Sequence, residues 1–125
     1  MKKILITSLI FSIVLMFTGI GTIFAEEKKA EKATTVTGEI VDTYCYALMG
    51  AKGASHKKCA TECLKKGIAA GLLEDGKDKL YILLPNKDET PLPKSVIEKA
   101  GEKVTVKGTV YTSGGVTFLT VDSVK

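Results

Sequence analysis

Two segments near the C-terminal end of the chain alternate apolar and polar residues, and they constrain the fold more than any other part of the sequence. They are residues 103–112 and 116–124, and Ser113-Gly114-Gly115 lies between them. Valines mostly alternate with lysines and threonines along these segments, which predicts a pair of strands with one buried face. The chain is therefore expected to be mainly β.

Three further strand patterns precede this pair. The first covers residues 34–43, and Gly38 within it predicts a bulge or a sharp coil of the strand. Two apolar runs follow at residues 68–73 and 79–84, and the turn-forming residues 74–78 between them predict a hairpin. The sequence thus carries five predicted strands.

Two short helices are predicted between these strands. Ser55 fits an N-cap and Gly67 fits the residue that follows a helix, which predicts a helix over residues 56–66. Residues 93–100 begin at a proline and end before Gly101, which predicts the second helix. This second helix separates the third strand from the fourth, which is the arrangement of the OB-fold, a partly open five-stranded barrel.

Residues 101–110, GEKVTVKGTV, follow the pattern G-x-x-V-x-V-x-G-x-V. The run resembles the fourth strand of small exported bacterial OB-fold (BOF-like) proteins, and the resemblance extends in outline over residues 34–125. It implies an OB-fold-like five-stranded barrel that serves as a binding module. The cysteine-bearing insertion at 44–67 is not part of that general pattern, but it occupies a loop that borders the usual ligand face of an OB-fold.

The first 25 residues are expected to lie outside this domain. Two lysines are followed by an uncharged apolar run, and Ala25 precedes a charged stretch, which is the layout of a secretory signal peptide or of an uncleaved anchor. Residues 26–33 then form a flexible charged tether, and 34–125 form the domain. The protein is therefore expected to be exported, periplasmic or extracellular, and to meet a membrane only through this segment.

The charge of the chain disfavours nucleic acid as a partner. All 18 basic residues are lysines, tryptophan is absent, and the lysines are interspersed with acidic residues. Without the two lysines of the first 25 residues, the formal charge falls from +4 to +2. Arginine is the preferred residue for bidentate contacts to phosphates and bases, so this surface does not resemble a nucleic-acid interface.

The three cysteines and the single histidine of the chain all lie within residues 45–63. On the predicted helix, His56, Cys59 and Cys63 fall on one stripe about 60° wide, and Cys45 approaches from the end of the preceding strand. Three thiolates and an imidazole make a tetrahedral set that suits zinc, and soft ligands also suit Cu(I). The sequence therefore predicts a metal site with Cys45, His56, Cys59 and Cys63 as ligands, which serves metal handling or sensing rather than catalysis.

Two other interpretations of the cysteines stay open. A disulfide from Cys45 to Cys59 or Cys63 would staple the insertion to the barrel, whose face would then bind a protein or a small molecule. Thiol redox chemistry is a third, because Cys59 lies near a helix N-terminus beside Lys57 and Lys58.

The sequence predicts no metal-binding or catalytic role for the residues around the cysteines. Tyr44 and Tyr46 flank Cys45 at strand spacing and are interpreted as packing residues. Asp42 and Glu62 are the nearest carboxylates, and no pairing between them is indicated.

Overall fold

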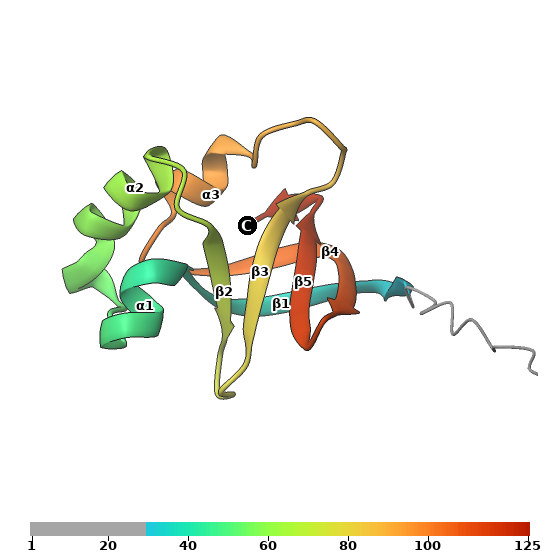
Figure 1. The fold of residues 1–125 in the computed structure, drawn as a ribbon, viewed down its shortest axis with the longest axis horizontal. Helices are drawn as coiled ribbons and strands as arrows, with labels where there is room; N and C mark the ends of the chain where they lie inside the picture. Colours follow the sequence, from blue (N-terminus) through green and yellow to red (C-terminus); the bar gives the residue numbers. More distant parts are fainter. Residues whose placement is uncertain (1–29) are drawn as a thin grey trace, which may run out of the picture.

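A computed structural model of the chain describes residues 30–125 (Figure 1). The predicted signal peptide or anchor and the first part of the predicted tether lie outside the described residues. Among the helices that are described, none has both the length and the apolar character that crossing a bilayer requires.

The prediction of a mainly β chain is confirmed. Within residues 30–125 the strands are β1 (Ala30–Asp42), β2 (Ala70–Glu74), β3 (Leu80–Pro85), β4 (Lys103–Ser113), β5 (Val116–Val121) and β6 (Ser123–Val124). The helices of the same range are α1 (Thr43–Met49), the 3₁₀ turn η2 (Ala54–His56), α2 (Lys57–Lys65) and α3 (Lys94–Glu98). Both predicted helices are present, as α2 and α3, but the described chain contains a third α-helix, α1, that was not predicted.

Five of the strands close into a barrel. Their order is β1-β2-β3-β5-β4, and an additional pairing of β1 with β4 joins the two edges. The β3–β5 pair is parallel, and the other neighbours in the barrel are antiparallel. The short strand β6 extends the sheet beyond β4.

Strand β1 holds the barrel together because it pairs with different strands on its two edges. Residues 30–39 pair with β4, residues 38–42 pair with β2, and Gly38 pairs with both Val104 and Glu74. A Cβ atom on Gly38 would lie 2.2 Å from the carbonyl oxygen of Leu73, so only glycine allows this close approach. The register shift in the strand lies between Ala30 and Ala33, so the bulge is not at Gly38.

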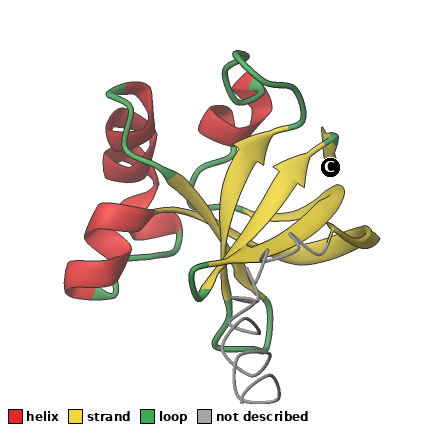
Figure 2. Cartoon of the chain, turned by 45° about the vertical axis from the view of Figure 1, so that its right-hand side comes forward, coloured by secondary structure: helices red, strands yellow, loops and turns green. Residues whose placement is uncertain are grey.

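The core fills the barrel and extends under the helices. Val104, Val106, Val110 and Val121 are buried, as the alternating pattern predicted. Ala60 and Leu64 of α2 and Val96 of α3 are buried in the same cluster. These contacts fix α2 against the barrel, while α1 lies beside α2 where β1 ends (Figures 1 and 2).

Candidate metal centre

Cys45 lies in the first turn of α1, because Asp42 caps that helix. Asp42 ends β1 with an extended backbone, and its Oδ1 accepts a hydrogen bond of 2.8 Å from the Cys45 N–H. Gly50 ends the helix in the left-handed conformation and donates its N–H to the Tyr46 carbonyl. The prediction that Cys45 sits at a strand end was therefore wrong, and so was the strand spacing of Tyr44 and Tyr46.

Cys59 and Cys63 lie one turn apart on α2, as predicted. The helix starts slightly later than expected: Ser55 belongs to η2, and His56 takes the N-cap position without a side-chain cap. Gly67 follows the helix with a φ of 92°, and its N–H donates to the Leu64 carbonyl. With the bond from Ile68 to the Cys63 carbonyl, this is a Schellman motif, so the prediction for Gly67 is confirmed.

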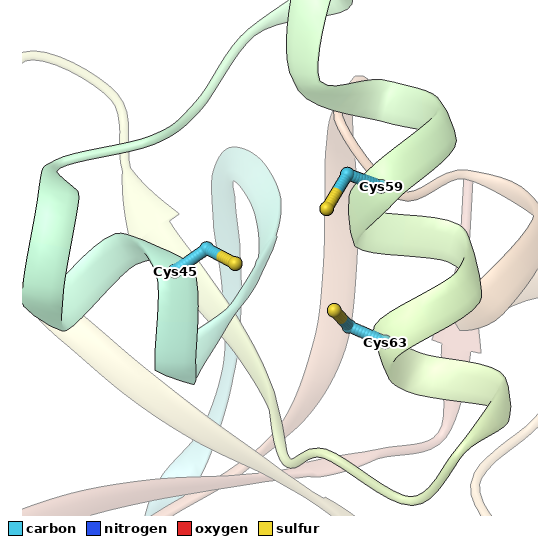
Figure 3. A group of neighbouring side chains, drawn as sticks. All are labelled: Cys45, Cys59 and Cys63. Atoms are coloured by element: carbon cyan, nitrogen blue, oxygen red, sulfur yellow. The ribbon is translucent and has the colours of Figure 1, made fainter.

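The three cysteine side chains point toward one another from the two helices (Figure 3). The Sγ atoms of Cys45, Cys59 and Cys63 all lie within 4.8 Å of one another. In a tetrahedral zinc site with Zn–S bonds of 2.3 Å, sulfur ligands lie about 3.8 Å apart. A thiophilic metal ion therefore fits the cluster after a small contraction.

Access to solvent differs among the three sulfurs. Cys45 is buried, Cys63 is half-buried and Cys59 is exposed, and within the described chain all three are free thiols. Burial, together with the neighbouring Asp42 carboxylate, raises the pKa of the Cys45 thiol to about 12. Burial and Asp42 also raise the pKa of Cys63. These two thiols stay protonated at neutral pH unless a positive charge compensates the thiolates, and a metal ion bound there would supply that charge.

His56 is held by Asp42. Its Nε2 lies 3.0 Å from Asp42 Oδ2, and the Asp42 side chain is completely buried. Burial alone would raise the pKa of Asp42, but the hydrogen bonds from the Cys45 N–H and from His56 outweigh it and lower the pKa. Asp42 therefore connects the two segments that carry Cys45 and His56.

The four predicted ligands and Asp42 thus form two groups that share Cys45, and His56 is grouped with Asp42 and Cys45 rather than with Cys59 and Cys63. One group is the three sulfurs, and the other comprises Asp42, Cys45 and His56, again with ligand atoms within 4.8 Å of one another. Asp42 was the group that sequence reasoning missed. Its position three residues before Cys45 is the spacing of an N-cap and its N3 residue, but this signal is readable only once α1 is recognised as a helix.

A separate hollow of about 430 Å³ lies beside the β2–β3 turn and includes none of the cysteines. Its lining residues are mostly charged, and two of its ion pairs are Glu74–Lys77 and Asp75–Lys103. Four of the seven charged residues that line the hollow are therefore paired with one another.

Comparisons with known proteins give this chain no relative. No protein-family model matches it, and neither a curated protein nor a solved structure matches it either.

Proposed function

We propose that this protein binds a thiophilic transition metal ion, zinc or copper, through the thiolates of Cys45, Cys59 and Cys63, and that the imidazole of His56 completes the Cys₃His set when the ion takes a fourth ligand. The observation that carries the proposal is the convergence of three sulfurs within 4.8 Å from two different helices. Thiolate and imidazole groups are the ligands that select zinc and copper over hard cations. A bound ion would act as a charge centre that keeps the thiolates ionised.

The role that fits this site is metal handling or sensing. Cys59 is exposed, so one ligand of the ion is open to exchange with solvent or with another molecule. The buried cluster inside the barrel is formed without any of the three cysteines, so the ion is not required to build the core. This arrangement supports an ion that is loaded and released rather than one that serves only as a permanent structural staple.

We also propose that the barrel is OB-fold-like and that the protein is exported. The strand order and the helix between β3 and β4 support an OB-fold-like barrel of the BOF-like kind. The insertion that carries the cysteines then occupies the loop between the first two strands, where OB-folds commonly bind ligands. The apolar N-terminal segment supports export of the protein.

The test is a metal and thiol inventory of the protein purified without chelators. Elemental mass spectrometry should find about one equivalent of zinc or copper, and three thiols should titrate after denaturation. Cys59→Ser should lose most of the metal, whereas Thr61→Ala on the same helix should keep it. Absence of metal with a single titratable thiol would overturn the proposal.

A structural disulfide is the second candidate for the role of the cysteines, because their sulfur atoms also lie close enough together for one to form. Cys45 could bond to Cys59 or Cys63 and staple α1 to α2, leaving one free thiol and a barrel that binds a partner on its face. The single-thiol outcome of the inventory would establish this alternative. For thiol redox chemistry, the third candidate, the raised pKa values of Cys45 and Cys63 disfavour these two thiols as nucleophiles, since the thiolate is the reactive form, and Cys59 would have to take that role.

A further inference from the structure

Asp42 occupies a position that the metal-binding proposal leaves unexplained. Carboxylates are rarely buried completely unless they are paired, and this one is buried at the junction of β1 and α1. Its two oxygens face different partners: Oδ1 accepts the Cys45 N–H, and Oδ2 faces His56 Nε2. One side chain therefore holds two of the four proposed ligands in place.

The contact with Asp42 also determines which nitrogen of His56 can bind a metal ion. An ionised carboxylate only accepts hydrogen bonds, so the ring nitrogen at 3.0 Å from it must carry the proton. In a neutral imidazole the other nitrogen then keeps the lone pair. That nitrogen is Nδ1, and it is the one ring atom of His56 that remains available as a ligand.

We propose that Asp42 is a positioning residue that fixes His56 as an Nδ1 ligand and thereby turns the three-thiolate cluster into a four-ligand site for Zn²⁺. Histidines that bind metal ions commonly donate their second ring N–H to a carboxylate, which orients the ring and raises its basicity. The inference rests on the proposed function, since it concerns the same ion.

The same residue sets the choice between the two candidate metals. Zinc takes four protein ligands in closed sites, so it uses the imidazole that Asp42 holds. Cu(I) is a soft ion that thiolates bind without an imidazole, so its binding depends on Cys45, Cys59 and Cys63 alone. Asp42 therefore favours zinc over Cu(I) at this site.

Asp42→Asn tests this directly because it preserves the shape of the side chain. The amide oxygen can still accept the Cys45 N–H, and the amide NH₂ then faces Nε2 as a donor. Nε2 must become the acceptor, so the proton moves to Nδ1 and the lone pair needed for metal binding is lost. The variant keeps the helix cap and removes the ligand.

The experiment compares wild type, Asp42→Asn, His56→Ala and the double variant by competition with a zinc-binding dye and, separately, with a Cu(I) chelator. Asp42→Asn should weaken zinc binding about 10–100-fold, and adding His56→Ala should cause no further loss. Cu(I) affinity should stay at the wild-type level in all four proteins, and far-UV circular dichroism checks that the variants are folded. Glu39→Gln is the matched control, because Glu39 accepts a backbone N–H from Gly53 and does not contact His56.

Nitrogen-15 NMR spectra of the metal-free wild type report which ring nitrogen of His56 carries the proton. A merely structural role of Asp42 would leave this unchanged in the variant. The expected result is a proton on Nε2, which shifts to Nδ1 in Asp42→Asn. A wild-type proton on Nδ1, or equal zinc affinities of wild type and Asp42→Asn, would overturn this inference alone. Failure of the wild type to bind either metal would overturn the proposed function and this inference with it.

Discussion

At the scale of single residues, Cys45 differs from the other two cysteines in both burial and charge environment. It is 6 % exposed, and its neighbour Asp42 places a carboxylate beside the thiol. Cys59 lies on the open side of the same cluster. The cluster therefore combines a buried sulfur, that of Cys45, with a sulfur that reagents in solution can reach, that of Cys59.

This difference predicts an order of alkylation in the metal-free protein. With a pKa of about 12, Cys45 reacts slowly at pH 8, because only about one thiol in ten thousand is ionised there. Its rate should rise about tenfold per pH unit between pH 8 and pH 11. Iodoacetamide labelling with peptide mapping should therefore modify Cys59 first and Cys45 last.

Zinc should protect all three cysteines in the same labelling experiment, since coordination to the cation withdraws electron density from each thiolate and lowers its nucleophilicity. Cys45 labelling at pH 8 as fast as that of Cys59 would contradict the burial and charge environment described above.

At the scale of elements, the crossing of β1 from β4 to β2 depends on Gly38. Gly38→Ala should destabilise the protein by about 3 kcal/mol, because the new methyl group meets the rigid Leu73 carbonyl at 2.2 Å. Denaturant unfolding measures the loss. Gly76→Ala is the control: nothing lies within 4 Å of its Cβ position, so only the cost of its left-handed backbone, about 1 kcal/mol, is expected. Equal losses of unfolding free energy in the two variants would show that the close approach of Gly38 to the Leu73 carbonyl does not matter for stability.

The β2–β3 hairpin contains a carboxylate whose charge supports the fold. Glu74 accepts hydrogen bonds from Lys77 at 2.6 Å and from the Tyr81 hydroxyl at 3.0 Å. The bond from Lys77 lowers the pKa of Glu74, burial raises it, and the bond from Tyr81 lowers it further, so the net direction is downward. A folded pKa below the unfolded value stabilises the protein above the unfolded pKa, and this stability is lost as the pH falls through the folded pKa.

Glu74→Gln should therefore cost about 1 kcal/mol at pH 7, and this difference from wild type should shrink as the pH falls below about 4. Urea unfolding of both proteins across this pH range measures it. A difference that does not change with pH would mean that the ionised form of Glu74 contributes nothing.

The elements also show where sequence reasoning succeeded and where it failed. The hairpin and the last two long strands were predictable, because alternation and glycine turns act locally. Helix α1 was not, since β-branched and aromatic residues such as Thr43, Tyr44 and Tyr46 favour strands. What makes the segment helical is the Asp42 cap and the left-handed Gly50, together with packing of Cys45. The strand propensity of these residues was overridden by helix capping and by tertiary contacts.

At the scale of the whole molecule, the barrel core and the cysteine cluster are separate structures. The buried cluster contains none of the three cysteines, and its residues come from the barrel strands and from one side of α2 and α3. The convergence of the cysteines was predictable because all three lie within residues 45–63. The role of Asp42 was not, because its contact with His56 joins residues 14 positions apart through the folded chain.

This separation predicts that the chelator-stripped protein stays folded. Far-UV circular dichroism should keep its β signature, and thermal unfolding should stay cooperative after metal removal. Adding zinc at about 100 times its dissociation constant should then stabilise the fold by about 2.7 kcal/mol. Hydrogen exchange should slow in α1 and α2 when zinc is present. Unfolding of the whole barrel on metal removal would contradict this picture.

The β1–β4 pairing has a consequence for the order in which the molecule assembles. The hydroxyl groups of Thr37 and Thr105 meet across the seam although 68 positions separate them, so the barrel cannot close until β4 is present. The proposed metal ligands, in contrast, span only residues 45–63, and a loop of this length closes at a smaller entropic cost. An ion can therefore be captured by the growing chain while the seam is still open. A bound ion would then protect the thiols of the chain from oxidants before the barrel closes.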